Sequence, residues 1–402
     1  MNFMTNYDIV IVGGGPAGLS AAYSAARKKA TTIVLEKDDS VAQNIRTSGV
    51  SWIDDIKRLG IPEKYYNPIK NFRIISPSKD IVLRGNTPKS CVLDVRATYQ
   101  YLATLAAKEG AEISVRSEVQ SVNVSPSNKI TGIVANTPKG KMKFDSKLVI
   151  DASGFRSIVA RKAGFAHNWT RYGVGAEYEC YCEDIDPETW ILMVGNKYSD
   201  AGYAWIFPIS KQRVRIGTGV GRPDSISDPI KKLNSIIENK FKPLDELNNI
   251  QPIEFHYGLI PNEGARKSTI FDGLLLVGDS AGQANPLVLE GIRFAIEFGR
   301  VAGEIGAKSL SKGCTKESLQ EYEKFWKQRV NSKIKSSLKV QSRWLKMNDD
   351  AWDKEVEIIQ QMTFDDFLDF IKAQFTTSKL MKLVLTHPHA TAKQLFSLIL
   401  DK

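Results

Sequence analysis

The stretch that decides the fold is Tyr7-Asp-Ile-Val-Ile-Val-Gly13-Gly-Gly15-Pro-Ala-Gly18-Leu, close to the start of the chain. An apolar strand leads into a Gly-x-Gly-x-x-Gly motif, and small residues suited to a helix follow it. In this context Gly13 makes a tight turn, Gly15 lets the backbone approach a pyrophosphate at the helix N-terminus, and Gly18 allows close packing of helix on strand. The stretch therefore predicts a strand-turn-helix unit that binds a dinucleotide.

The next strand, Thr31 to Leu35, ends at Glu36. A carboxylate at this place accepts hydrogen bonds from a ribose and disfavours a 2′-phosphate, so we expect an adenosine with a free ribose. A β-α-β unit of this kind seeds a parallel sheet.

Farther along the chain, residues 172–257 show alternating, aromatic-rich runs that are typical of a mostly antiparallel sheet. Leu274 to Val277 then reads as a strand that returns to the nucleotide domain, and residues from Thr315 onward read as helical. The fold class is therefore α/β. We predict a Rossmann-type domain of residues 1–45, 94–165 and 265–310, an antiparallel-sheet substrate-binding domain of residues 46–93 and 166–264, and a C-terminal helical region of residues 311–402.

Length and composition agree with a globular protein, since the 402 residues are 42% hydrophobic and 25% charged. We find neither a long uncharged apolar run nor a signal peptide, which favours a cytoplasmic location. The net charge of +10 suits a phosphate-bearing partner, such as a cofactor or an anionic lipid surface. Nucleic-acid binding is not expected, because no motif supports it.

The cysteines and histidines do not indicate a metal site. Their spacings match neither a CxxC clip nor a set of histidine ligands, and the cysteines are too few for a disulfide scaffold, so we expect free thiols. The residues concerned are Cys91, Cys180, Cys182, Cys314, His167, His256, His387 and His389.

Three later segments extend the dinucleotide motif: Asp94-Val95-Arg96, Asp151-Ala-Ser-Gly154, and Gly278-Asp279-Ser-Ala-Gly282 followed by Asn285-Pro286 and Glu290-Gly291-Ile292. Their order and spacing resemble the flavoproteins related to aromatic hydroxylases, over residues 7–310. The resemblance implies bound FAD, with Asp279 on the ribityl chain and Arg96 near the cofactor phosphates. A helix that begins near Glu290 would also direct its positive end at the flavin and stabilise an anionic reduced ring. The predicted cofactor-binding residues are Gly13, Gly15, Gly18, Glu36, Arg46, Arg96, Asp279, Gly291 and Ile292.

The motif Tyr203-x-Trp205-x-Phe207-Pro208 narrows the resemblance. It is similar to the geranylgeranyl reductases, and among them to the digeranylgeranylglycerophospholipid reductases. In that family the aromatic motif lines the tunnel for the isoprenoid, which implies that Tyr203, Trp205 and Phe207 bind substrate. Alternation places the three rings on one face of a strand, a pattern that plain core aromatics share, so both interpretations stay open.

This chain departs from the family in two segments, the loop beside the flavin and the stretch after Pro286. Where several members carry a cysteine beside the flavin, this chain has Arg46-Thr-Ser48-Gly49, and the usual Gly-rich stretch after Pro286 reads Val288-Leu-Glu-Gly291. The proton for double-bond reduction would then come from Ser48 through water, from Tyr203, or from solvent. One dinucleotide motif is present, so the electron donor is left open between a transiently bound NAD(P)H and a ferredoxin-like carrier.

The segment from Lys324 to Lys346 is basic and amphipathic, with Trp326 and Trp344 among its apolar residues. It fits peripheral binding at the inner face of an anionic membrane, and it fits equally well a solvated helix that packs its apolar side on the flavin domain.

We predict an FAD-dependent reductase that saturates isoprenoid double bonds of a lipid precursor. The main alternative is an FAD-dependent monooxygenase or halogenase of the same fold, and another is a flavin-bound lipid-binding or regulatory protein without turnover. A halogenase would need a catalytic lysine and a Trp-rich motif, whereas this strand begins with Tyr203 and has one Trp, which favours the reductase.

Overall fold

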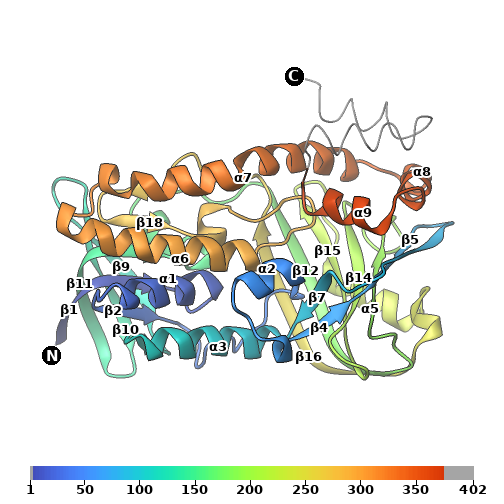
Figure 1. The fold of residues 1–402 in the computed structure, drawn as a ribbon, viewed down its shortest axis with the longest axis horizontal. Helices are drawn as coiled ribbons and strands as arrows, with labels where there is room; N and C mark the ends of the chain where they lie inside the picture. The colour runs from blue at the N-terminus through green and yellow to red at the C-terminus, as the bar shows by residue number, and fades with distance from the viewer. Residues whose placement is uncertain (1–2, 375–402) are drawn as a thin grey trace.

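The computed structural model describes residues 3–374 and contains two large sheets covered by helices (Figure 1). The first sheet has eight strands in the order β17-β18-β11-β1-β2-β8, with β10 and β9 attached to β11. The neighbours of β1 pair with it in parallel. Its strands are β1 (Phe3–Val12), β2 (Thr32–Leu35), β8 (Glu112–Ser114), β9 (Glu118–Val124), β10 (Ile130–Thr137), β11 (Gly140–Asp151), β17 (Ile270–Phe271) and β18 (Leu274–Leu276).

The helices that cover this sheet include α1 (Pro16–Arg27), α3 (Val95–Lys108) and α6 (Ile292–Ser309). Helices α1 and α6 lie side by side, because Gly299 and Gly303 of α6 bring its backbone against α1. A Cβ at either glycine would overlap the carbonyl oxygen of Ala17 or Ala21. Helix α6 is therefore packed closely against α1, the helix that follows the dinucleotide motif.

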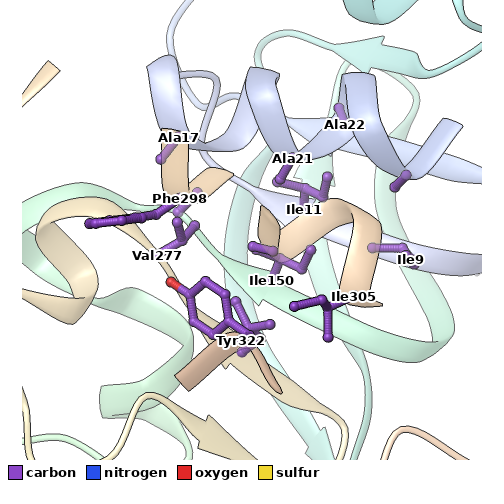
Figure 2. Close-up of a cluster of buried hydrophobic side chains, with 14 of the residues drawn as sticks. Ile9, Ile11, Ala17, Ala21, Ala22, Ile150, Val277, Phe298, Ile305 and Tyr322 are labelled. Atoms are coloured by element: carbon purple, nitrogen blue, oxygen red, sulfur yellow. The ribbon is translucent and has the colours of Figure 1, made fainter. Parts of the chain in front are cut away.

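The core of this part lies between the sheet and the two locked helices (Figure 2). The cluster contains Ile9 and Ile11 of β1, Ile150 of β11, Ala21 of α1 and Phe298 of α6. Burying each large aliphatic or aromatic side chain contributes about 1.5–3 kcal/mol. The cluster joins residues from Ile9 to Ile334, so segments far apart in the sequence build the nucleotide-binding part together.

The second sheet has seven strands in the order β16-β12-β15-β14-β13-β5-β6. All neighbouring strands are antiparallel except β13 and β5. One face packs on α5 (Pro229–Glu238). The predicted fold class is thus confirmed. The strands are β5 (Asn71–Ile75), β6 (Asp80–Arg84), β12 (Tyr172–Glu183), β13 (Thr189–Met193), β14 (Gly202–Pro208), β15 (Arg213–Arg222) and β16 (Asn248–Pro261).

A small third sheet, β3-β7-β4, lies in the segment between residues 46 and 93. That segment also supplies β5 and β6 to the second sheet, which supports its assignment to the substrate-binding part; the domain limits themselves stay a prediction. The remaining elements here are β3 (Val50–Trp52), α2 (Ile53–Arg58), β4 (Tyr66–Ile69), β7 (Ser90–Leu93) and, later in the chain, α4 (Ile158–Lys162).

The C-terminal part consists of three helices up to Ile371, namely α7 (Lys316–Trp344), α8 (Asp349–Gln360) and α9 (Phe364–Ile371). The long α7 runs along the molecule beside α6 (Figure 1). Its Trp326 is 1% exposed and donates a hydrogen bond to Thr269 Oγ1 at 3.0 Å.

Val330 and Ile334 of α7 are buried in the same core as Trp326, so this helix packs its apolar side on the flavin domain, as one of the two interpretations required. Within residues 3–374 no helix has both the length and the apolar character needed to cross a membrane. His387 and His389 lie outside the described residues.

Candidate functional site

A continuous cavity of about 690 Å³ lies between the dinucleotide motif and the free face of the second sheet. One end is lined by the glycine turn and by charged side chains, and the other end is apolar. Gly18 and Arg96 are the two predicted site residues that do not line it. The predicted residues that do are Gly13, Gly15, Glu36, Arg46, Ser48, Tyr203, Trp205, Phe207, Asp279, Gly291 and Ile292.

The glycine turn has the geometry that a pyrophosphate needs. Gly13 has a φ of 109°, and a Cβ there would overlap the carbonyl oxygen of Ala152. A Cβ at Gly18 would overlap the carbonyl of Gly13, which accounts for the absence of Gly18 from the cavity wall. A Cβ at Gly15 would meet no atom within 4 Å, so this glycine borders open space just before α1 begins at Pro16. The turn thus leaves room for a phosphate at the helix N-terminus.

Glu36 is fixed beside this turn. Its Oε2 accepts a hydrogen bond from the Gly14 amide at 2.7 Å, and its Oε1 accepts one from the Asp38 amide at 2.9 Å. The carboxylate is held at the cavity wall, where it can meet a ribose. Arg46 forms an ion pair with Asp38 at 3.3 Å at the same end.

Arg96 supports the cavity from outside its wall. Its guanidinium donates to the carbonyl oxygens of Ala42 at 2.6 Å and Gln43 at 3.1 Å, and it is paired with Glu254. Its contact with the cofactor phosphates therefore stays a prediction, and the contacts present give it the role of holding the loop that leads to Arg46.

Asp279 lies on the turn after β18 and faces the cavity, where burial raises the pKa of its carboxyl to about 6. A Cβ at Gly291 would lie 3.5 Å from Asp279 Oδ1, and α6 begins at the next residue, Ile292. The carboxylate and the positive end of a helix thus meet at one place. This arrangement fits the hydroxyls of a ribityl chain and a flavin ring whose reduced form carries negative charge.

The aromatic motif forms one wall. Tyr203, Trp205 and Phe207 project from the same face of β14, with ring centroids 5.8 Å apart for the first pair and 6.0 Å for the second. Trp205 lies over Gly217 of β15, where a Cβ would overlap the indole, and beside Gly219. The prediction that the three rings share a face is confirmed, and all three line the cavity. Their contact with a substrate stays a prediction.

A buried polar network under Trp205 was missed in the sequence. Glu177 of β12 accepts a hydrogen bond from Trp205 Nε1 at 2.6 Å through Oε2, and its Oε1 lies 2.8 Å from His256 Nδ1 on β16. Both Glu177 and His256 are 3% exposed and line the cavity. The signal in the sequence was the alternation Gly173, Gly175, Glu177, which places a charge on the inward face of a strand.

The loop that replaces the family's cysteine is held by Arg215, which is 2% exposed. Its Nη1 donates to the Ser48 carbonyl at 2.8 Å and to the Leu93 carbonyl at 3.0 Å, while Gly258 packs against the Arg46 carbonyl. None of the four cysteines, all within residues 3–374, lines the cavity.

Of the two predicted proton donors, Tyr203 is the more constrained. Its hydroxyl donates to the Val288 carbonyl at 2.8 Å, and burial raises its pKa. Ser48 lines the cavity on the Arg215-held loop, so its position is well defined.

The far end of the cavity is apolar and aromatic. Trp52 and Trp190 meet edge to face with centroids 5.9 Å apart, and α8 and α9 close this end with Trp352, Phe367 and Ile371. Such a lining suits a long hydrocarbon group rather than a polar aromatic acid.

Comparison with known proteins shows to which family the chain belongs. A family model described as FAD dependent oxidoreductase matches residues 8–263. Digeranylgeranylglycerophospholipid reductase of Methanocaldococcus jannaschii is 32% identical, and the alignment covers 92% of this chain and 95% of the relative. The chain is an FAD-dependent oxidoreductase of the digeranylgeranylglycerophospholipid reductase family. A second member of this family, digeranylgeranylglycerophospholipid reductase 2 of Methanothermobacter thermautotrophicus, is 30% identical over 88% of this chain and 90% of its own.

A solved structure of a geranylgeranyl bacteriochlorophyll reductase-like protein from Thermoplasma acidophilum matches with a TM-score of 0.86 at 26% identity, covering 99% of this chain and 100% of that one. The flavin-dependent brominase Bmp2 matches with a TM-score of 0.66 at 18% identity over 98% and 97%, a likeness of fold alone. The resemblance to the geranylgeranyl reductases and the expectation of FAD are both confirmed, and the residues of the polar end fit that cofactor.

Proposed function

We propose that this reductase saturates the carbon-carbon double bonds of geranylgeranyl chains in a lipid precursor. The observation that carries the proposal is the continuity of one cavity, from the glycine turn that suits FAD to an aromatic end that suits an isoprenoid. The relatives whose names specify a digeranylgeranylglycerophospholipid support the choice of substrate.

When bound, reduced FAD supplies the hydride. In the proposed arrangement the Gly13–Gly15 turn and Glu36 bind the adenosine half, and Asp279 orients the ribityl chain. Trp205 and Phe207 hold the isoprenoid against the flavin end, while the apolar end excludes water.

For the proton we propose Ser48 acting through water. Tyr203 is less suited, because its hydroxyl proton is engaged by the Val288 carbonyl and burial raises its pKa. Replacing Ser48 with Ala should slow lipid-dependent reoxidation, whereas Tyr203→Phe should leave it closer to wild type. The reverse order would assign the proton to Tyr203.

The electron donor and the cellular location belong to the same proposal. Electrons come either from NAD(P)H that visits the cavity transiently or from a ferredoxin-like carrier; anaerobic mixing with each donor in turn, followed at the flavin absorbance, separates them. We propose peripheral contact with an anionic membrane for two reasons. The proposed substrate is a lipid, and the net charge of +10 attracts the chain to a negatively charged surface. Co-sedimentation with anionic and neutral vesicles tests it.

The decisive experiment uses photoreduced, FAD-loaded protein mixed with a geranylgeranyl lipid without oxygen. Flavin reoxidation together with a gain of hydrogen in the lipid, read by mass spectrometry, supports the reductase. Rapid oxygen consumption without lipid reduction would support a monooxygenase instead, and lipid binding without either reaction would leave a binding protein.

A further inference from the structure

Three titratable side chains on two neighbouring strands form a line from the protein surface to the cavity wall. Glu254 and His256 lie on the same face of β16, and His256 is paired across the strands with Glu177 of β12. The Glu254 side chain is 36% exposed and does not line the cavity, whereas His256 and Glu177 are 3% exposed and do line it. One end of the line therefore meets solvent and the other end meets the cavity.

The histidine ring joins the two carboxylates. Its Nδ1 lies 2.8 Å from Glu177 Oε1. Its Nε2 has no hydrogen-bond partner within residues 3–374 and lies 3.6 Å from Glu254 Oε1. That distance exceeds a hydrogen bond by a few tenths of an ångström, a gap that rotation of a partly exposed side chain can close. Because an imidazole can accept a proton at one nitrogen and release one from the other, the ring is able to pass a proton between Glu254 and Glu177.

The charges around this ring balance without it. They are three carboxylates and three guanidiniums, supplied by β12, β15, β16 and α3. With His256 neutral their sum is zero, and a proton on the ring adds one positive charge beside two carboxylates. The ring can therefore gain and lose a proton without leaving a buried charge unpaired. The charged side chains are Glu177, Glu179, Arg213, Arg215, Glu254 and Arg96.

The inner end of the line lies beside the loop of the proposed proton donor, Ser48. Arg215 Nη1 donates to the Ser48 carbonyl at 2.8 Å, and Arg215 Nε lies 3.8 Å from Glu177 Oε1, so one guanidinium separates the two residues. Gly258, two residues after His256, packs against the Arg46 carbonyl of the same loop. A serine hydroxyl can pass on a proton but is too weak an acid to be its source. Ser48 therefore needs a group that replaces its proton after each turnover.

We propose that Glu254, His256 and Glu177 form a proton relay that carries a proton from solvent into the cavity and replaces the one that Ser48 gives to the lipid. This inference rests on the proposed function. In each turnover the π bond of the lipid breaks, and the lipid takes a hydride from reduced FAD at one carbon and a proton at the other. The lipid gains a pair of electrons and the flavin is oxidised. Glu177 returns a proton to Ser48 through cavity water, His256 reprotonates Glu177, and Glu254 brings the next proton from solvent.

The alternative is that His256 only orients Glu177 under Trp205. That role uses Nδ1 alone and gives Nε2 and Glu254 no part. His256→Asn separates the two roles, because an asparagine amide can donate to Glu177 as Nδ1 does but cannot pass a proton. Glu254→Gln makes the corresponding change at the outer end of the relay, since its amide oxygen can still accept a hydrogen bond from Arg96.

The experiment follows anaerobic reoxidation of photoreduced, FAD-loaded, full-length protein by a geranylgeranyl lipid, with the rate expressed per bound flavin. The wild-type rate should fall as pH rises from about 5 to about 8, the range in which histidine ordinarily loses its proton. His256→Asn and Glu254→Gln should each lower the rate about tenfold or more and flatten its pH dependence. Added imidazole should restore part of the rate of His256→Asn. His167→Asn, at an exposed histidine that does not line the cavity, should match wild type.

A second measurement needs no turnover. In protein labelled with nitrogen-15 at histidine, NMR measures the exchange of the His256 ring proton with water, and loss of the signal in His256→Asn assigns it. Glu254→Gln should slow this exchange, because the carboxylate that brings protons to the ring is gone. The signal of His167 in the same spectra is the internal control and should not change.

Two results would overturn the relay. One is a wild-type rate at every pH in both variants, and the other is ring-proton exchange that Glu254→Gln leaves unaltered. If His256→Asn melts early or loses FAD, Glu254→Gln decides alone, since its side chain is partly exposed. A wild-type protein that the lipid does not reoxidise at any pH would instead count against the proposed function, so the two failures are distinguishable.

Discussion

The indole Nε1 of Trp205 donates a hydrogen bond to Glu177 Oε2 at 2.6 Å, across the intervening strand β15. Glu177 also contacts His256, and Arg215 lies 3.8 Å from its carboxylate, so this wall of the cavity is held by buried charge as well as by packing. The aromatic motif is thus fixed in orientation from beneath.

The first prediction concerns this bond. A double-mutant cycle with Trp205→Phe and Glu177→Gln should give a coupling free energy of about 1–3 kcal/mol, because a charge-assisted bond to a buried carboxylate is lost. Urea unfolding of the FAD-loaded variants measures it. Glu183→Gln, at the exposed end of the same strand, serves as the control, and additivity of the two changes would mean that the bond contributes nothing.

A second prediction concerns the glycines under Trp205. Gly217→Ala should displace the indole and cost about 1–3 kcal/mol, because its Cβ would overlap the ring. Gly219→Ala should cost much less, since its Cβ would lie 3.4 Å from the same ring, where a small shift relieves the contact. Melting curves and tryptophan fluorescence compare the two, and an equal cost would contradict the placement of the indole over Gly217.

The third prediction follows from the pKa of Asp279, which is raised from 3.8 to about 6 by burial. The folded apoprotein then binds this proton more tightly than the unfolded chain, so its stability falls as pH rises from about 4 to about 6 and this contribution is level above that. Because ribityl hydroxyls donate to the ionised carboxylate, FAD should bind more tightly as pH rises through about 6.

Two variants separate this effect from other titrations. Asp279→Asn should flatten the pH dependence of FAD affinity between pH 5 and 7, measured by flavin fluorescence, while Glu36→Gln should weaken binding and keep the slope. We also expect Asp279→Ala to lower flavin occupancy more than Glu36→Gln does. A wild-type slope in Asp279→Asn would remove this carboxyl from the cofactor.

The fourth prediction compares neighbours on α7. Trp326→Ala should cost about 3–5 kcal/mol, because this side chain is 1% exposed and fills the core between α7 and the first sheet. Phe325→Ala, at a side chain that is 37% exposed, should cost far less. If Trp326 instead served a membrane surface, its variant would melt like wild type and lose vesicle binding.

Local sequence was enough to predict which residues of these segments line the cavity, while their roles toward a ligand stay predictions. The glycine turn, Glu36 and the Gly-Asp279 segment can each be recognised from a few neighbouring residues. The aromatic motif can be recognised from the alternation of its residues. Glu177 and His256 lie on strands whose pairing is set by the whole sheet, so neither could be matched with the other from the sequence.

The same limit applies to α7 and to Arg96. Amphipathic spacing indicates that a helix has an apolar side, but whether a core or a membrane covers that side depends on contacts with residues such as Thr269, far away in the chain. Arg96 was placed near the cofactor by resemblance, whereas its hydrogen bonds hold a loop that only the folded chain brings within reach.

The contact of Gly299 and Gly303 with α1 has a consequence for motion. The backbones of α1 and α6 touch without side chains between them. The turn that suits a pyrophosphate, which precedes α1, and the Asp279 carboxylate, which lies near the start of α6, are therefore held at a fixed spacing. The two halves of the bound cofactor cannot be pulled apart without breaking that contact.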